Sequence, residues 1–251
     1  MKTRWDYTEL AETYSLRPRY ADAAVDRIVA LPDRPRPSVA DLGAGTGHLT
    51  LDLAARGCLV DAVEPNAAMA SIGRRRTAHL GEVRWFTGTG EETGLATGAY
   101  DLVTYGSSFN TMDREAALRE AARLVGPRGH IACVWNHRDL SDPLQTEIEC
   151  LIRSRIPEYD YGSRREDQAP VIDASGLFGP AEPVSAQVWH RVRPKDWIAA
   201  WRSHGTLRRQ AGPLFDELVD GIQGLVEASE QSPVLVPYLT VGWVAPRREA
   251  T

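Results

Sequence analysis

The sequence has little cysteine, no long apolar run and no strongly basic segment, and each shortage excludes a class of protein. Three cysteines in 251 residues do not make an even disulfide framework. Cys58, Cys133 and Cys150 lie in apolar strand-like or helical runs, which predicts buried, reduced thiols. No run of about 18 apolar residues, the length of a membrane-spanning helix, is present. Residues 1–6 are charged and lack the apolar centre of a signal peptide, so we expect a cytoplasmic protein.

Charge of either sign is spread along the chain. The 34 acidic and 29 basic residues give a formal net charge of -5. The tightest basic cluster, residues 74–76, lies late in an expected helix, where positive charge complements the helix dipole. Nucleic-acid enzymes usually carry a basic stripe, so we expect no nucleic-acid partner. No His or Cys spacing fits zinc, and Asp139 with Asp142 is a weak carboxylate pair, so we expect no metal site.

The first half of the chain alternates between short apolar strands and helices. Residues 1–31 form a helical preface, because apolar residues recur at helical spacing over 21–31 and a proline-rich segment follows. In the core, residues 38–139, strands are expected at 39–42, 59–63, 83–86, 100–105 and 130–135, and helices at 49–55, 67–76 and 114–125. Such alternation predicts an α/β fold with a Rossmann-like, doubly wound, mostly parallel sheet.

The second half of the chain is less regular. Residues 140–251 are expected to add a small helical cap and the final strands to the same single domain, 1–251. Helices are expected at 142–155, 196–201 and 214–228, and strands at 184–192 and 235–244. The two strands complete the sheet as an antiparallel edge. The polar, turn-rich segment 159–168 is a candidate lid or substrate loop.

A glycine-rich loop, residues 41–47 (Asp-Leu-Gly-Ala-Gly-Thr-Gly), follows the first core strand and opens a helix. Gly43 and Gly45 permit a tight turn and close approach of a ligand, and Gly47 permits close helix packing. The third glycine comes four positions after the first, whereas the dinucleotide fingerprint requires it five after, where His48 stands. A phosphate-binding loop would need Lys and Ser or Thr after the last glycine, and this chain has His and Leu.

Glu64 stands at the carboxyl end of the second core strand. Doubly wound sheets bind ligands at this edge, and a carboxylate there can accept both hydroxyl groups of a ribose. Nicotinamide enzymes use the same acid, so the glycine spacing, and not Glu64, separates the two classes.

These motifs and several others together resemble the class I S-adenosylmethionine-dependent methyltransferases of the small-molecule branch, methyltransferase type 11, which includes ubiquinone/menaquinone and trans-aconitate types. The similar segments are 14–18 (Tyr-Ser-Leu-Arg-Pro), 39–47, 63–66 (Val-Glu-Pro-Asn), 88–95 (Gly-Thr-Gly-Glu-Glu-Thr-Gly-Leu), 100–110, 124–130 and 134–136. The resemblance covers about residues 14 to 139, and weaker likeness continues beyond.

The resemblance implies S-adenosyl-L-methionine as the cofactor and assigns residues to it. The candidate cofactor-binding residues are Tyr14, Arg17, Asp41, Gly43, Ala44, Gly45, Gly47, Glu64, Pro65, Asn66, Met69, Gly90, Glu91, Gly106 and Ser107. Residues 43–45 would contact the methionyl part, and Tyr14 with Arg17 its carboxylate. Glu64 would bind the ribose. Residues 66, 69, 90 and 91 would surround the adenine.

The acceptor side of the reaction is less defined. An amine or carboxylate acceptor needs little proton management, whereas a hydroxyl needs a general base, most often histidine. His137, His204 and Asn110 are the catalytic candidates, and His190 is weaker. Asn110 stands where the family often has histidine. Aromatic residues 5, 7, 14, 105, 109, 197 and 201 could wall a pocket.

The expected function is S-adenosylmethionine-dependent methyl transfer to an oxygen or nitrogen of a small-molecule metabolite, with natural-product tailoring as one such role. Two alternatives remain open: a nicotinamide-dependent oxidoreductase, and a non-catalytic member of the fold that binds the cofactor. The sequence identifies neither the acceptor nor the oligomeric state.

Overall fold

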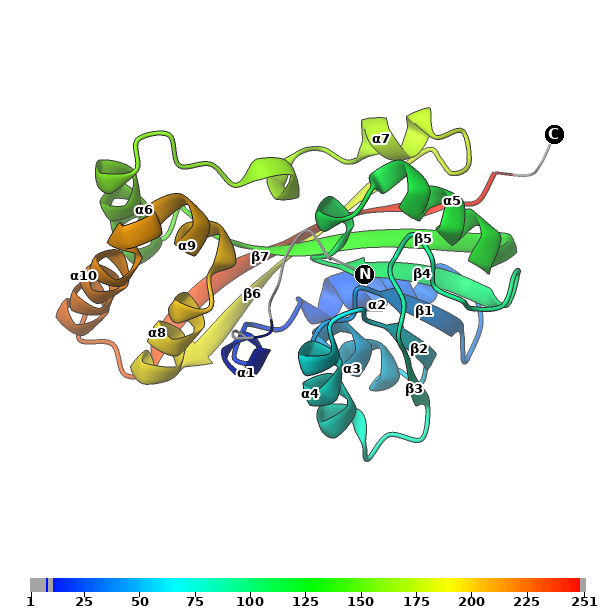
Figure 1. Ribbon diagram of the computed structural model, residues 1–251, viewed down its shortest axis with the longest axis horizontal. Coiled ribbons are helices and arrows are strands. Elements are labelled where there is room, and N and C mark those ends of the chain that lie inside the picture. The colour runs from blue at the N-terminus through cyan, green and yellow to red at the C-terminus, as the bar shows by residue number, and fades with distance from the viewer. Residues whose placement is uncertain (1–7, 9–10, 249–251) are drawn as a thin grey trace.

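The computed structural model describes residue 8 and residues 11–248. Within them, one sheet of seven strands has the order β3-β2-β1-β4-β5-β7-β6, and β7 is antiparallel to both of its neighbours (Figure 1). The strands are β1 Ser38–Leu42, β2 Leu59–Val63, β3 Val83–Phe86, β4 Tyr100–Gly106, β5 Val125–Arg138, β6 Glu182–Val192 and β7 Val234–Pro246. This arrangement confirms the predicted doubly wound, mostly parallel sheet with an antiparallel edge.

Helices cover both faces of the sheet. On one face lie α2 (Asp22–Ala30), α3 (His48–Ala54) and α4 (Ala67–Thr77), and on the other lie α5 (Arg114–Leu124) and α7 (Ala169–Ala174). Neighbouring strand residues alternate between the two resulting cores: Val39 packs with α2 and α3, and Ala40 packs with α5. Because both faces are buried, the parallel strands are mostly apolar.

A helical cap adjoins the carboxyl end of β5. It consists of α6 (Pro143–Arg155), α8 (Pro194–Arg202), α9 (Gly205–Ala211) and α10 (Phe215–Ala228). The cap has its own apolar core, to which β7 contributes Val234 and Val236. Figure 1 shows β6 and β7 running from the sheet into this cap. The short helix α1 (Ala11–Tyr14) lies between the cap and α4.

The observed elements differ from the predicted ones where pairing between distant segments sets the length of a strand, and where a helix is very short. The strand predicted at 130–135 is longer in both directions, because Val125 pairs with β4 and residues 130–138 pair with β7. The helices α7 and α9 were not predicted, since six and seven residues are too few to show a helical period. The helix predicted at 142–155 is α6, and Asp142 caps it by accepting a hydrogen bond from the Gln145 amide.

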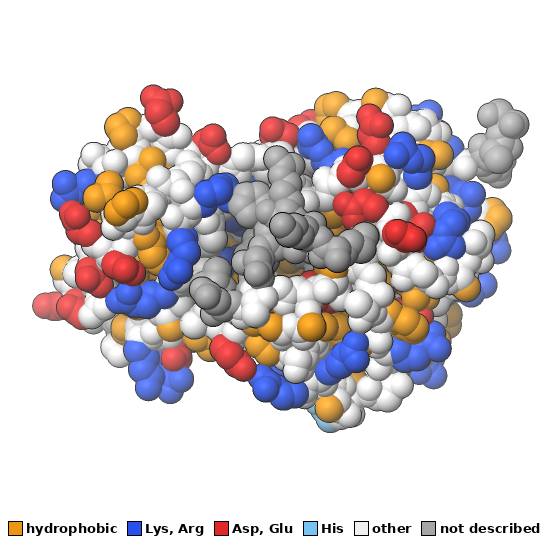
Figure 2. All heavy atoms as spheres, viewed as in Figure 1, with side chains coloured by type: hydrophobic (Ala, Val, Ile, Leu, Met, Phe, Trp, Pro, Cys, Tyr) orange, Lys and Arg blue, Asp and Glu red, His pale blue; other side chains and the backbone are white. Residues whose placement is uncertain are grey.

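Acidic and basic side chains are interspersed over the face drawn in Figure 2. Within the described residues, none of the helices combines the length and the apolar character needed to cross a bilayer.

Candidate active site

The glycine-rich loop leaves the sheet directly after β1. The amides of Gly43 and Ala44 donate to the Val63 carbonyl at 2.9 and 3.1 Å, which ties the loop to the end of β2. Gly43, Gly45 and Gly47 all have positive φ, at 68°, 59° and 79°. This backbone conformation disfavours residues with a Cβ, so the turn requires glycine at alternate positions.

Gly43 and Gly45 differ in what surrounds them. A Cβ on Gly43 would lie 2.6 Å from the Ser108 Cβ, so the protein itself fills that space. A Cβ on Gly45 would meet nothing closer than the Met69 Cε, at 3.4 Å. Gly45 therefore leaves room beside its backbone.

Glu64 is bonded to the same loop. Its carboxylate is buried and accepts hydrogen bonds from the Gly45 amide at 2.8 Å and the Asn66 amide at 2.9 Å. Burial raises the pKa of Glu64, and the two amide bonds oppose this rise. Asn66 in turn caps α4 through the Met69 amide, at 3.1 Å. Hydrogen bonds therefore join Glu64, the glycine-rich loop and the start of α4 into one unit at the carboxyl edge of β1 and β2.

Asp41 is the loop's other acid. Its side chain is fully buried and accepts hydrogen bonds from the hydroxyls of Thr50 at 2.6 Å and Thr104 at 2.9 Å. Burial raises the pKa of Asp41 to about 6, although both hydroxyls favour the charged form. Asp41 therefore braces the base of the loop against β4 and α3.

Gly90 lies against the Met112 side chain, as Gly43 of the loop does. A Cβ on Gly90 would fall 2.2 Å from the Met112 Sδ, and one on Gly43 would fall 2.9 Å from the Met112 Cε. Glu91 accepts a hydrogen bond from the Asp113 amide at 2.9 Å. The flexible Met112 side chain thus reaches between the two glycines. Sequence reasoning missed Met112, since nothing in its local pattern distinguishes it from core methionines.

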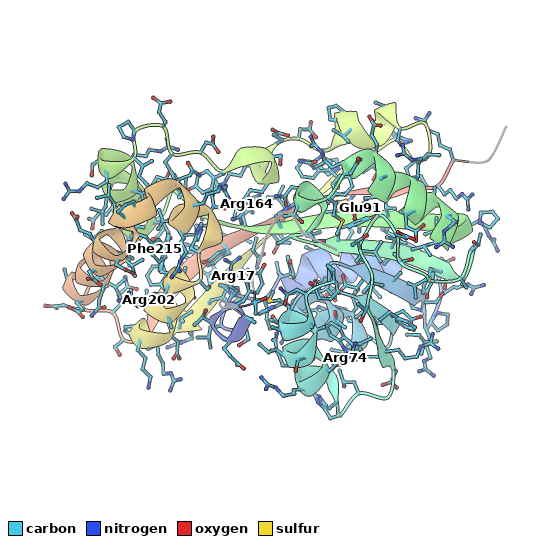
Figure 3. The ribbon with its side chains drawn as sticks, viewed as in Figure 1. Arg17, Arg74, Glu91, Arg164, Arg202 and Phe215 are labelled. Atoms are coloured by element: carbon cyan, nitrogen blue, oxygen red, sulfur yellow. The ribbon has the colours of Figure 1, made fainter. Side chains whose placement is uncertain are left out.

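A cleft of about 1020 Å³, including its part open to solvent, lies between the glycine-rich loop and the cap. Its lining residues come from the preface, the loop, the ends of β4 and β5, the segment around Arg164, α8 and β7: Tyr14, Arg17, Pro18, Tyr20, Asp41, Gly43, Ala44, Gly45, His48, Leu49, Gly106, Ser107, Asn136, His137, Arg138, Tyr161, Arg164, Arg165, Trp197, Ala200, Trp201, His204 and Tyr238. Figure 3 shows Arg17 and Arg164 between the cap and the sheet.

The cleft brings together only part of the predicted site. The residues predicted for the methionyl end of the cofactor line it, and so do His137 and His204. Glu64, Pro65, Asn66, Met69, Gly90 and Glu91 are not lining residues, and neither is Gly47.

The preface closes the cleft from the N-terminal side. The Arg17 guanidinium donates to the Ser203 carbonyl at 2.9 Å and stacks 4.0 Å over the Tyr14 ring. The Tyr20 hydroxyl lies 3.0 Å from the Ser107 Oγ. The preface therefore links the cap to the loop and to β4. Residues 5 and 7, two of the aromatics considered for the pocket wall, lie outside the described residues.

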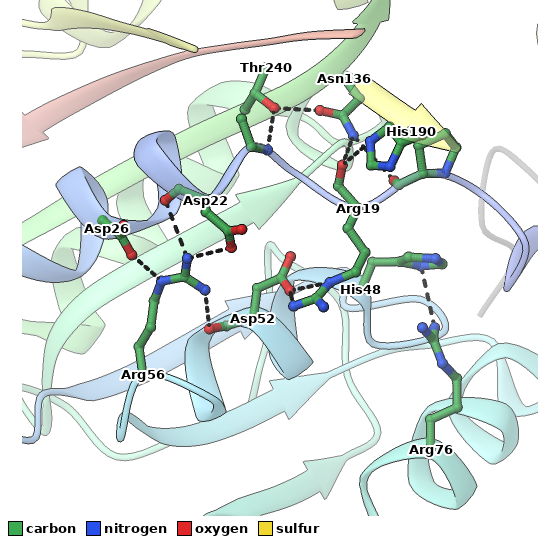
Figure 4. A network of polar contacts seen from close by, with 12 residues as sticks. Arg19, Asp22, Asp26, His48, Asp52, Arg56, Arg76, Asn136, His190 and Thr240 are labelled. Atoms are coloured by element: carbon green, nitrogen blue, oxygen red, sulfur yellow. Dashed lines mark hydrogen bonds and ion pairs between the residues drawn. The ribbon is translucent and has the colours of Figure 1, made fainter. Parts of the chain in front are cut away.

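A polar network anchors the segment that follows Arg17 (Figure 4). The Arg19 side chain pairs with Asp52 of α3. The Arg19 carbonyl accepts from the Asn136 amide group at 2.7 Å and contacts the His190 Nε2 at 3.1 Å. The Thr240 hydroxyl donates to Asn136 Oδ1 at 2.6 Å. His190 thus belongs to this anchor and does not line the cleft.

The two candidate histidines of the cleft are both poor bases. His137, near the end of β5, has its pKa lowered to about 3 by burial and by the charges of Arg164 and Arg165. His204 caps α9, with its Nδ1 accepting a hydrogen bond from the Leu207 amide at 3.1 Å. Burial and neighbouring arginines also lower the pKa of His204. Because Nδ1 is an acceptor, the proton of neutral His204 resides on Nε2, which makes that nitrogen a donor.

The remaining candidates after β4 do not line the cleft. The Asn110 Oδ1 accepts a hydrogen bond from the Trp135 Nε1 at 2.8 Å, and Asn110 does not line the cleft. Tyr105 and Phe109 are fully buried and pack against each other, at 5.1 Å between ring centroids. The interpretation of these two aromatics as pocket walls was wrong, because they complete the core between β4 and α5.

Sequence reasoning missed the basic part of the cleft. Arg138, Arg164 and Arg165 line it, together with Tyr161 and Tyr238. Three of these residues, Tyr161, Arg164 and Arg165, lie in the segment 159–168, which was expected as a lid or substrate loop. Within the described residues, no group of three or more His, Cys, Asp or Glu side chains could hold a metal ion.

The known proteins that this chain resembles include several methyltransferases. Residues 40–133 match the family model described as a methyltransferase domain. An uncharacterized methyltransferase of Mycobacterium bovis is 39% identical over 123 residues, which cover 49% of this chain and 48% of that protein. A ubiquinone/menaquinone biosynthesis C-methyltransferase of Rubrivivax gelatinosus is 34% identical over 38% of each chain. The matched segment therefore spans about half or less of each relative's length.

The fold extends the similarity over most of the chain. The solved structure of a putative type II methyltransferase from Anaeromyxobacter dehalogenans superposes with a TM-score of 0.62 and 19% identity, covering 92% of this chain and 96% of that one. The strand order and the glycine-rich loop agree with this fold. The chain therefore has the fold of that methyltransferase structure, and its residues 40–133 are similar to the methyltransferase domain family.

Proposed function

We propose that the protein binds S-adenosyl-L-methionine and transfers its methyl group to an oxygen or nitrogen of a small-molecule metabolite held in the cleft. The observation that carries this proposal is the bond between the buried Glu64 carboxylate and the Gly45 amide. This bond joins the ribose-binding acid and the glycine-rich loop into one preorganised unit at the ligand-binding edge of the sheet.

The residues present fit the cofactor. An ionised carboxylate has about four acceptor positions, and two of those on Glu64 are used by backbone amides, so two remain for a ribose diol. The room beside Gly45 admits a ligand against the backbone. Tyr14 and Arg17 would hold the methionyl carboxylate, and Met112 would move from between Gly43 and Gly90 to admit the adenine. Methionine side chains adapt readily to such a change.

When bound, S-adenosyl-L-methionine supplies a methyl group on a sulfonium, which passes to the lone pair of the acceptor as the carbon–sulfur bond breaks and leaves its electrons on sulfur. The chain's contribution is position and exclusion of water. Tyr20 and Ser107 hold the preface against β4, and the cap covers the cleft. The lowered pKa values of His137 and His204 make both side chains weak bases. This favours acceptors that attack with a lone pair already available, such as an amine or a carboxylate.

Parallel calorimetry with S-adenosylhomocysteine and NADH tests the cofactor. We expect saturable binding of S-adenosylhomocysteine and none of NADH; binding of NADH alone would instead indicate an oxidoreductase. Release of S-adenosylhomocysteine in a panel of amine, carboxylate, phenol and activated-carbon acceptors then tests transfer. Transfer to carbon alone would contradict the assignment to oxygen or nitrogen, and would agree with the C-methyltransferase name of the Rubrivivax relative. Tight cofactor binding without transfer to any acceptor would indicate a non-catalytic member of the fold.

A further inference from the structure

The cleft is lined by four arginines, of which three have no acidic partner among the described residues. Arg138 forms a buried ion pair with Glu149, at 3.1 Å. No carboxylate of a described residue lies within ion-pair distance of Arg17, Arg164 or Arg165.

Neutral groups hold these arginines in place without balancing their charge. The Arg164 Nη2 donates to the Asn136 carbonyl at 3.1 Å. The Arg165 guanidinium stacks 3.9 Å over the Tyr161 ring. Arg17 is held by a carbonyl and an aromatic ring in the same way. The side chains are therefore positioned, but a net positive charge remains in the cleft.

That uncompensated charge is costly, and its effects appear on the neighbouring groups. Burial and the charge of Arg17 lower the pKa of Arg164. Arg164 and Arg165 contribute to the low pKa of His137. Asp41, the acidic side chain among the lining residues described, is occupied by two threonine hydroxyls. A cleft lined by charges of one sign focuses their field and attracts ligands of the opposite charge.

Hydrogen-bond donors without partners lie in the same part of the cleft. The Arg165 Nε, the Trp201 Nε1 and the His137 Nδ1 are buried atoms without a hydrogen-bond partner among the described residues. The first two are donors only, so they require an acceptor. A buried donor left unpaired costs free energy, which a ligand rich in acceptor oxygens would recover.

Aromatic side chains form the walls next to these donors. Trp197 and Trp201 of α8 are buried and line the cleft, and the His204 ring stacks on Trp201 with 5.2 Å between centroids. Tyr161 and Tyr238 also line it. Flat apolar faces beside a cationic corner suit a ligand with a planar or apolar body and a charged group at one end.

We propose that the methyl acceptor is an anion, a carboxylate or a phosphate ester, whose charged group binds to Arg164 and Arg165 while its body lies against Trp197 and Trp201. The inference rests on the proposed function, because it names the class of acceptor for the same cleft. Guanidinium groups match both oxyanions through paired N–H donors. Arg17 is left to the cofactor's own carboxylate.

Matched small probes test this assignment. Calorimetric titrations use the full chain saturated with S-adenosylhomocysteine, and the probes are benzoate, phenyl phosphate and benzamide, which has nearly the shape of benzoate without its charge. We expect at least one of the two anions to bind at least tenfold more tightly than benzamide. Preference for benzoate indicates a carboxylate acceptor, and preference for phenyl phosphate indicates a phosphate ester. Equal binding of benzamide, or saturation by neither anion, overturns the proposal.

Variants then separate the acceptor site from the cofactor site. Arg164→Gln and Arg165→Gln should each weaken the preferred anion at least tenfold and leave the affinity for S-adenosylhomocysteine within about twofold. Arg128→Gln, which removes an exposed arginine of β5, should change neither. Lower affinity for S-adenosylhomocysteine with unchanged anion binding would mean that these arginines serve the cofactor, and would overturn the proposal. Arg164→Lys keeps the charge and should retain part of the preference over benzamide.

The two proposals fail in different ways. If the native chain does not bind S-adenosylhomocysteine, the proposed function fails, and the benzoate and benzamide titrations without it still test the anion site. If S-adenosylhomocysteine binds and the anions do not, only the present inference fails.

Discussion

Replacing Glu64 with glutamine is the sharpest test of the cofactor site. The substitution keeps the size of the side chain and exchanges one acceptor oxygen for an amide group. In the native structure both carboxylate oxygens accept from backbone amides, Gly45 at 2.8 Å and Asn66 at 2.9 Å. The new NH₂ group would face one of these N–H groups, so one bond to the loop or the helix start is lost. The same change removes half of the acceptors offered to a ribose.

The expected magnitude follows from the charged hydrogen bonds that are lost. Hydrogen bonds to an ionised group contribute about 1.5–3 kcal/mol each, so loss of about 2 kcal/mol corresponds to an affinity about 30-fold weaker. Stability should change much less. Because burial raises the pKa of Glu64, its ionised form costs stability at neutral pH. Glutamine removes this cost, which offsets the loss of one hydrogen bond. We therefore expect a weak binder with a nearly native melting temperature.

Calorimetry with S-adenosylhomocysteine and thermal melting at pH 7.5 measure the two quantities. Glu115→Gln is the matched control, because Glu115 is an exposed glutamate of α5. Unchanged affinity of the Glu64→Gln variant would show that the ribose binds elsewhere. A melting temperature that falls in proportion to the affinity would show that Glu64 acts by holding the loop and makes no direct contact with the cofactor.

Three other substitutions test separate parts of the site. Gly45→Ala and Gly57→Ala both place a Cβ at positive φ, which costs about 1 kcal/mol of stability. Only Gly45→Ala should also weaken the binding of S-adenosylhomocysteine, by tenfold or more in calorimetry. Equal effects of the two substitutions on binding would refute this. Asp41 has a folded pKa of about 6 against 3.8 for the free side chain, so its contribution to stability is complete below pH 3.8 and is lost as the pH rises through 6. Asp41→Asn should remove that loss of stability, which is roughly 3 kcal/mol at most. Urea unfolding at pH 4.5 and 7.5 measures it, and an equal change in the free energy of unfolding for the native and the variant protein would contradict the prediction. Asn110→Ala should leave the buried Trp135 indole unpaired and lower the free energy of unfolding by about 1–3 kcal/mol. The rate of methyl transfer per folded molecule should not change. A loss of kcat at unchanged stability would instead make Asn110 catalytic.

The parallel half of the fold could be predicted because its determinants are local. Strands buried on both faces are apolar runs, and the helices between them show a clear period, as in α5. The antiparallel half was harder. The length of β5 depends on pairing with β7, more than a hundred residues later, which carries the strand past its apolar run into His137 and Arg138. The periodicity of the sequence around β5 does not show which distant strand it pairs with.

The candidate site also has one part that local sequence predicts and one part that it does not. The glycine-rich loop and Glu64 are 19 residues apart and adjoin consecutive strands, so their spacing alone predicts that they meet. The acceptor side is assembled from the preface, the end of β5, the segment around Arg164 and α8. An arginine in any one of these segments is an ordinary surface residue, and only the packing of the cap against the sheet places Arg17 near Arg164. Composition predicted a loop at 159–168, but it did not predict the charge of the cleft.

Electrostatics connects the identity of the acceptor with the role of His137. In the cleft as described, Arg164 and Arg165 help to hold the imidazole neutral, with its pKa near 3. A carboxylate or phosphate bound to these arginines would compensate their charge and favour the protonated imidazole, since an opposite charge nearby raises the pKa of histidine. The histidine would then act as a further hydrogen-bond donor to the anion, in keeping with its buried Nδ1 that lacks a partner among the described residues. Burial, with a smaller contribution from these arginines, makes His137 a poor base in the cleft as described. An anionic acceptor bound to the arginines would therefore be expected to convert His137 from a neutral side chain into a hydrogen-bond donor.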